Sequence, residues 1–276
     1  SFACLALEHL RPFLAPLYRW QAATPQTACL RLPAGISATL LWLSQKLLGA
    51  PLRRIPNGKR YLDIKIFTDA KADDDEVFIG GWESRGGAGP EGARWFAFRI
   101  TVEDAPWLWC RGPPGRTIST IEMLATYVGV QLFLNGSDAA YDNTDAHVEI
   151  TGETDNKGNA AMMTKCMTTA YPAMLLLMEM CELLDMVNVS LTLNWRRREL
   201  NQPADDLTNG DFQLFDETQR IDCKLKDIRM PVVQRLSEEL TKIFKTDLNP
   251  KRLNTEEERG EAKRQRTGRA QASALE

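Results

Sequence analysis

The sequence predicts an α/β protein: a mixed five-stranded sheet, three antiparallel strands plus two parallel strands, with helices on both faces. The first observation is the order of the predicted elements, in which three strands precede an alternation of helices and two further strands. The second is that strands 62–67, 77–82 and 94–101 follow one another directly, as in an antiparallel meander. The third is that helices separate strands 147–153 and 188–195 from the strands before them, as in parallel crossovers.

The central strand is predicted in the stretch 62–70, which reads LDIKIFTDA. Its apolar residues alternate with charged ones, the period of two that is typical of a strand. The strand is expected to end near Phe67, so that Asp69 stands where a buried strand meets its loop. In open α/β sheets this carboxyl end is where binding sites usually lie.

Helices are predicted from apolar residues that recur every three or four positions. The predicted helices cover 34–50, 117–133, 157–166, 172–186, a short segment after the turn that begins at 196, and 230–247. Within the fourth of these, Glu179, Glu182 and Asp185 share one stripe, which we interpret as a solvent-facing side. The methionines concentrated between 162 and 186 are interpreted as core packing.

The composition limits the function classes. The 276 residues carry a net charge of -3, so any site for a polyanion must be a local basic patch. Six cysteines without a CxxC pair, and two histidines far apart, argue against zinc and predict free thiols in a reducing, intracellular compartment. The first 20 residues carry charges that exclude a signal-peptide core, so secretion is not expected. The most apolar stretch, 171–187, is too short and too charged to span a membrane.

Four segments are expected along the chain. Residues 1–57 are interpreted as a connector, 58–215 as the α/β domain, 216–249 as a segment with a C-terminal amphipathic helix, and 250–276 as a charged, flexible tail. The opening of the sequence in the middle of a pattern suggests a piece of a longer protein.

Four carboxylates lie where this layout would bring them together: Asp69, Glu122, Asp155 and Asp205. Like charges repel one another unless a cation separates them. Two Mg²⁺ ions about 3.5–4 Å apart can hold both sides of a phosphate during its displacement, and Mg²⁺ prefers oxygen ligands.

The motifs that carry these acids resemble a known family. They are FTDA at 67–70, TISTIEMLA at 117–125, TDNKGN at 154–159 and LNWRRRELNQPADDLT at 193–208. Their content and order are similar to the ribonuclease H domains of retroelement reverse transcriptases, especially DIRS-type and pararetrovirus-like elements. The resemblance covers about residues 58–215, and the segment RPFLAPLYRW at 11–20 resembles the region after the polymerase thumb in such polyproteins.

The resemblance implies a ribonuclease H-like fold with Asp69, Glu122, Asp155 and Asp205 as catalytic metal ligands. It further implies two Mg²⁺ or Mn²⁺ ions, an RNA–DNA hybrid as substrate and an upstream polymerase domain as partner. Asn156 would orient the Asp155 loop and Asn201 would brace the last helix, both near the nucleic acid. Neither histidine can supply the mobile His that some members carry, and the adjacent Asp206 is an alternative to Asp205.

Structural interpretations stand beside these functional ones. An Asp at a strand end or turn often serves as a turn former or helix cap, and Ser119 with Glu122 fits a capping box. The basic run Arg196, Arg197 and Arg198 is interpreted equally well as a solvated loop or as a contact for a phosphate backbone.

The ordered set of four acids predicts a metal-dependent enzyme, and the resemblance implies an endonuclease that hydrolyses the RNA strand of RNA–DNA hybrids. A proofreading-type exonuclease would carry a second acid where Lys71 stands, and an integrase would end its acidic set on Glu. The alternative outside catalysis is a degenerate domain that binds nucleic acid or serves as a scaffold, because a fold by itself does not establish chemistry.

Overall fold

The computed structural model describes residues 8–24, 31–49, 59–73, 75–135 and 147–244. Its five strands are β1 (Lys59–Ala72), β2 (Glu76–Arg85), β3 (Trp95–Thr101), β4 (His147–Thr154) and β5 (Val189–Trp195). The α-helices are α2 (Ala15–Ala23), α3 (Ala34–Gly49), α4 (Ile118–Asn135), α5 (Lys157–Lys165), α6 (Ala173–Met186), α7 (Gln202–Asn209) and α8 (Pro231–Phe244). Short 3₁₀ helices are η1 (Glu8–Leu14), η2 (Pro90–Gly92), η3 (Pro106–Trp109), η4 (Pro114–Thr117), η5 (Arg198–Leu200), η6 (Glu217–Gln219) and η7 (Leu225–Asp227).

The five strands form one mixed sheet in the order β3-β2-β1-β4-β5. β1 pairs antiparallel with β2, which pairs antiparallel with β3. On its other side β1 pairs parallel with β4, and β4 pairs parallel with β5. This order, with three antiparallel strands at one edge and two parallel ones at the other, confirms the predicted ribonuclease H-like fold.

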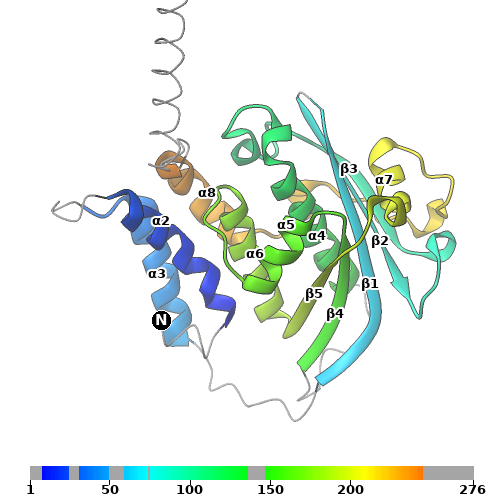
Figure 1. Ribbon diagram of the computed structural model, residues 1–276, viewed down its shortest axis with the longest axis horizontal. Helices are drawn as coiled ribbons and strands as arrows, with labels where there is room; N and C mark the ends of the chain where they lie inside the picture. The colour runs from blue at the N-terminus through cyan, green and yellow to red at the C-terminus, as the bar shows by residue number, and fades with distance from the viewer. Residues whose placement is uncertain (1–7, 25–30, 50–58, 74, 136–146, 245–276) are drawn as a thin grey trace, which may run out of the picture.

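Helices cover both faces of the sheet (Figure 1). On one face α4 contacts β1 and β2, and α6 and α8 pack behind it. On the opposite face α7 contacts β1, β2 and β3 over a smaller apolar cluster that includes Phe67, Trp82, Trp95 and Leu207. Within the described residues, one helical stretch, Pro114–Leu134, is long and apolar enough to cross a membrane, and most of it is buried inside the protein.

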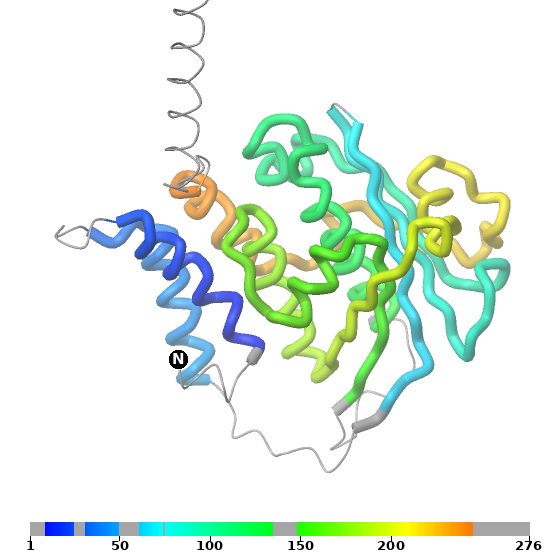
Figure 2. Tube along the Cα trace, viewed as in Figure 1, coloured from blue at the N-terminus to red at the C-terminus, as the bar shows by residue number. Residues whose placement is uncertain are grey.

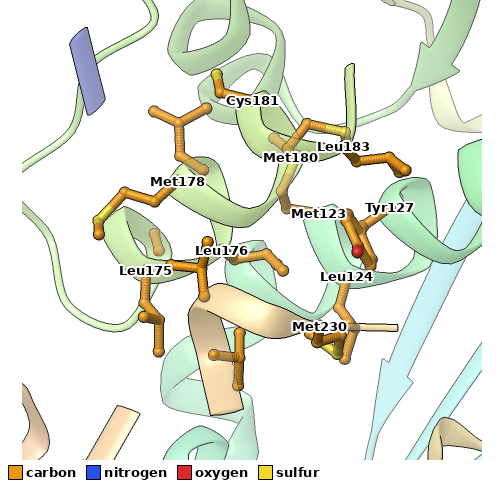
Figure 3. Close-up of a cluster of buried hydrophobic side chains, with 14 of the residues drawn as sticks. Met123, Leu124, Tyr127, Leu175, Leu176, Met178, Met180, Cys181, Leu183 and Met230 are labelled. Atoms are coloured by element: carbon orange, nitrogen blue, oxygen red, sulfur yellow. The ribbon is translucent and has the colours of Figure 1, made fainter. Parts of the chain in front are cut away.

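The larger core lies where α4, α6 and the start of α8 meet. Figure 3 shows Met123, Leu124 and Tyr127 of α4 facing Leu176 and Met180 of α6, with Met230 close by. All six side chains are at most 5% exposed. The prediction that methionines of α5 and α6 serve the core is confirmed for five residues, namely Met162, Met163, Met174, Met178 and Met180, and is wrong for Met186, which is 53% exposed.

The N-terminal helices pack against the same core. Figure 2 shows the blue segment beside the orange one, and α3 contacts α8 while η1 contacts α6. Phe13, Ile36 and Trp42 are buried in the core cluster that also contains residues of the sheet. The boundaries at 57, 215 and 249 stay predictions, and the predicted tail 250–276 lies outside the described residues.

The acidic stripe of α6 was predicted to face solvent, and this prediction is wrong. Glu179 is 1% exposed, and its Oε2 accepts a hydrogen bond of 2.7 Å from the backbone N–H of Val233. Glu182 pairs with Lys46 of α3, and Asp185 lies 3.5 Å from His9 of η1. The stripe faces the helices that cover α6. Glu179 accepts a hydrogen bond from the N-terminus of α8, and Glu182 and Asp185 lie beside the basic side chains of Lys46 and His9.

Candidate functional site

The carboxyl edge of the parallel half of the sheet carries the predicted acids. β1 was predicted to stop near 67, but it runs to Ala72. Its pairing with β4 ends at Phe67, opposite Glu153, whereas its pairing with β2 continues to Ala72. Asp69 therefore lies inside the strand rather than in a loop, on a part of β1 that projects beyond β4.

Asp69 is held in surroundings that oppose its ionisation. It is 6% exposed, and the Thr208 hydroxyl of α7 lies 3.4 Å from its Oδ2 as a donor. Burial, followed by the charge of Asp155 and then that of Asp205, raises the pKa of Asp69 to about 7. The backbone N–H of Ala70 and the charge of Arg198 act in the opposite direction.

Glu122 reaches the same place from α4. Its side chain is half-buried, and its Oε2 accepts a hydrogen bond of 3.3 Å from the Asn159 side chain. Burial, together with the charges of Asp155 and Asp69, raises its pKa to about 7, against a hydrogen bond from Asn156. The charge of Asp155 raises the pKa of both Glu122 and Asp69, so the two carboxyl groups share one electrostatic environment.

The capping-box interpretation of Glu122 is wrong. α4 begins at Ile118, so Ser119 is already inside the helix, and the first helical turn contains no acid. The Ser119 carbonyl instead accepts a hydrogen bond of 2.9 Å from the Asn159 side chain. The preceding residues Pro114–Thr117 form η4, which leads the chain directly into α4 without a side-chain cap at Ser119.

Asp155 follows the last residue of β4, and its charge acts on both Asp69 and Glu122. Its carbonyl accepts a hydrogen bond of 2.9 Å from the indole N–H of Trp195, the last residue of β5. The two neighbouring parallel strands thus fix the backbone that carries this carboxylate.

Asp205 comes from the first turn of α7. Its Oδ1 accepts a hydrogen bond of 2.7 Å from Arg198, and its Oδ2 accepts one of 3.0 Å from Asn209. Asp206 is held by Gln202 at 2.7 Å, whereas Asp205 is among the charges that raise the pKa of Asp69. Of the two candidates, Asp205 is the one whose charge reaches the acidic cluster.

The two predicted asparagines hold the backbone near the acids in different ways. The Asn156 side chain caps α5 by accepting from the backbone N–H groups of Gly158 and Asn159. Asn201 is 2% exposed and donates a hydrogen bond of 3.2 Å to the Thr68 carbonyl, which ties the start of α7 to β1. The structure thus places Asn201 as a brace behind Asp69, and direct contact with nucleic acid stays a prediction for both residues.

The three arginines after β5 differ in their surroundings. Arg196 lies over the Phe67 ring at 4.9 Å, and its Nε is 3.8 Å from a Glu153 oxygen. Arg197 is exposed. Arg198 is also exposed but pairs with Asp205, and its charge lowers the pKa of both Asp69 and Glu122.

Three residues that contact the acids were not singled out in the sequence: Thr208, Asn159 and Trp195. Thr208 lies one helical turn after Asp205, so helical spacing from that acid would have placed it on the same side. Asn159 belongs to the motif TDNKGN and Trp195 to LNWRRRELNQPADDLT, but neither motif says which backbone or carboxylate the side chain reaches.

The donor chemistry of this cluster fits divalent cations. Carboxylate oxygens are the ligands that Mg²⁺ and Mn²⁺ prefer. The raised pKa values of Asp69 and Glu122 come first from burial and then from the negative charges of neighbouring acids, which a cation would offset. Within the described ranges no group of three or more His, Cys, Asp or Glu side chains is arranged to hold a metal ion. The fit is one of donor type and charge, and the carboxylates do not form a closed coordination shell.

Comparison with known proteins gives similarity of structure only. No family model matches the sequence, and no curated protein matches it. The ribonuclease H1 of the halophilic archaeon Halobacterium salinarum NRC-1 is 15% identical with a TM-score of 0.36, over 54% of this chain and 97% of that one. The N-terminal RNase H domain of Rv2228c from Mycobacterium tuberculosis is 15% identical with a TM-score of 0.37, and the match covers 55% of this chain and 94% of that one. LC11-RNase H1, solved in complex with an RNA/DNA hybrid, is 16% identical with a TM-score of 0.36, and the match covers 54% of this chain and 96% of that one. Because these TM-scores are low, the fold of this chain is defined by its own strand order and strand directions.

Proposed function

We propose that the chain is a divalent-metal-dependent endonuclease that hydrolyses the RNA strand of RNA–DNA hybrids. The observation that carries the proposal is that four separate elements bring Asp69, Glu122, Asp155 and Asp205 to one edge of the sheet, where the charges of these acids act on one another. A structural role in caps or turns would not require acids from β1, α4, the end of β4 and α7 to gather in one place.

The chain's own residues have distinct tasks in this proposal. Asp69 and Glu122, with pKa values of about 7, would give up their protons to hold cations. The two cations, when bound, would activate water and stabilise the leaving oxygen. Asn201 and Thr208 hold β1 and α7 together, which keeps Asp205 near Asp69.

Substrate binding is assigned to the arginines that follow β5. Arg197 and Arg198 are exposed beside the acids and would contact phosphates of the backbone, which position nucleic acid without reading its sequence. Selectivity for the RNA strand would come from its 2′-hydroxyl groups, the chemical difference between the two strands.

The wider setting is also a proposal. The order of the motifs FTDA, TISTIEMLA, TDNKGN and LNWRRRELNQPADDLT supports an origin in a retroelement polyprotein with a polymerase domain upstream. An intracellular location is supported by the scattered cysteines, none of which forms a CxxC pair.

The test is cleavage of an RNA–DNA hybrid labelled on either strand, with Mg²⁺, with Mn²⁺ and with excess chelator. Single-stranded RNA and duplex DNA serve as comparison substrates. We expect internal cuts in the RNA strand of the hybrid alone, and none with chelator. Hybrid binding without cleavage under every metal condition would favour the non-catalytic alternative.

A further inference from the structure

Arg198 stands between the acidic cluster and an open groove. Its guanidinium Nη2 lies 2.7 Å from Oδ1 of Asp205. The same residue lines a groove of about 590 Å³ together with Trp195, Arg197, Glu199 and Leu200. One side chain therefore borders both the carboxylates proposed to hold cations and a surface hollow next to them.

We propose that Arg198 is a positioning residue that exchanges partners. In the protein alone it pairs with Asp205, and when a hybrid enters the groove it transfers to a backbone phosphate and frees the Asp205 carboxylate. This inference rests on the proposed function and adds to it that substrate binding makes the Asp205 carboxylate available to a cation.

The pair between Arg198 and Asp205 is suited to exchange. The Arg198 side chain is 73% exposed, so water competes for its charge and the ion pair contributes little to folding. A phosphate offers the planar guanidinium the same two-point contact as a carboxylate. The loss of Asp205 as a partner can therefore be compensated by the phosphate.

Asp205 keeps its place when the arginine leaves. Its Oδ2 also accepts a hydrogen bond of 3.0 Å from Asn209, one helical turn further along α7. The departure of Arg198 would remove a positive charge from Asp205 without releasing the carboxylate from its neighbours. The freed oxygen is then available to a cation.

The groove offers an aromatic ring and two arginines to a nucleotide next to the acids. The Trp195 ring is 43% exposed, and the Lys157 ammonium lies 4.2 Å from its centre. The indole N–H of Trp195 is bonded to the Asp155 carbonyl, so the groove wall and the Asp155 backbone are one unit. A phosphodiester in this groove would contact Arg197 and Arg198, and the next phosphodiester along the strand would lie near Asp155.

The consequence is a reciprocal coupling. If hybrid binding removes Arg198 from Asp205, then cation binding at Asp205 must favour hybrid binding to the same degree. The part of Arg198 on each side of this coupling is measured separately, each time without the other ligand. One is Mn²⁺ affinity of the protein alone, and the other is affinity for the hybrid in excess chelator.

Arg198→Gln is compared with Arg197→Gln, which removes the same charge from the neighbouring position. Among the described residues Arg197 makes no ion pair, yet it lines the same groove. We expect Arg198→Gln to strengthen Mn²⁺ binding by up to about fivefold, the range set by an exposed ion pair, and to weaken hybrid binding. Arg197→Gln should weaken hybrid binding and leave the Mn²⁺ affinity unchanged.

Each outcome decides between the two proposals. A wild-type protein that binds neither Mn²⁺ nor the hybrid overturns the proposed function and this inference with it. A wild-type protein that binds both, with Mn²⁺ affinities that are equal in the two variants or that fall in Arg198→Gln, overturns the partner exchange alone.

Discussion

Asp69 and Glu122 show how the fold modifies single residues. Both are carboxylic acids whose ordinary pKa lies near 4, and burial beside Asp155 brings each to about 7. A carboxyl group that ionises near neutral pH is easily loaded by a cation, because the cation displaces a proton that is only weakly held.

Glu122→Gln separates a ligand from a structural residue. The amide keeps an oxygen that accepts the hydrogen bond from Asn159 and removes a charge that burial disfavours. We expect the melting temperature of the metal-free variant to equal or exceed that of the wild type. Hybrid cleavage should fall by about 10²-fold or more, since a neutral amide does not hold a divalent cation. The exposed Glu91→Gln is the matched control, and a fully active Glu122→Gln protein would remove this residue from the site.

At the scale of elements, the close approach of α7 to β2 decides where Asp205 lies. A Cβ added at Gly80 would stand 2.7 Å from Cβ of Leu207, so only glycine allows this packing. Gly80 is paired with Asp69 in the sheet register. Gly80 therefore sets the distance between β2 and α7, the helix that carries Asp205, next to Asp69 on the neighbouring strand.

Gly80→Ala tests this arrangement. We expect a loss of about 1–3 kcal/mol in the free energy of unfolding, the usual cost of overpacking a core. Thermal unfolding should show a melting temperature lower by roughly 2–4 °C for each kcal/mol lost, and cleavage should fall as α7 moves. Gly92→Ala is the control, because a Cβ added there would meet no heavy atom within 4 Å and the stability should hardly change. Equal melting temperatures for both variants would contradict the close approach.

The contact between α6 and α8 has its own pH dependence. Burial of Glu179 raises its pKa to about 8, against hydrogen bonds from the backbone N–H groups of Val233 and Val232. Glu182 nearby adds to this shift, and Arg229 reduces it. Since the folded pKa is above the unfolded one, the stabilisation is complete at low pH and is lost as the pH rises through about 8.

Glu179→Gln should remove this loss of stability. At pH 4, below the ordinary Glu pKa of 4.5, the wild-type residue is protonated and resembles the amide, and the two proteins should melt at nearly the same temperature. At pH 9 we expect the variant to be the more stable one. The measurement is thermal unfolding of both proteins across this range without metal, and a wild type that gains on the variant as the pH rises would show the opposite sign.

Elements were predictable from the sequence to different degrees. The alternation in LDIKIFTDA located β1, but pairing with β2 on one side and β4 on the other extends it beyond that pattern to Ala72. The exposure of the stripe on α6 was mispredicted because spacing identifies a face of a helix without showing what covers it. Here η1 and α8 pack on α6, and Lys46 of α3 pairs with Glu182 of the stripe.

At the scale of the whole molecule, the strand order was predictable because three strands in sequence form a meander and helices between strands form crossovers. The four acids followed from motif order. Their partners Thr208, Asn159 and Trp195 did not, because each contact joins residues from different elements. The core shared between the N-terminal helices and the sheet was also not foreseen, since it depends on packing between distant segments.

The central claim is that acids from separate elements act as one metal-dependent site. Its most direct test is the initial rate of RNA-strand cleavage in an RNA–DNA hybrid, with Mg²⁺, by the wild type, Asp69→Asn, Asp155→Asn and the double variant. We expect each single substitution to lower the rate by about 10²-fold or more. The double variant should be about as active as the less active single variant, because the effects of residues that act as a unit do not add. Wild-type rates in either single variant, or losses that multiply in the double variant, would contradict the claim.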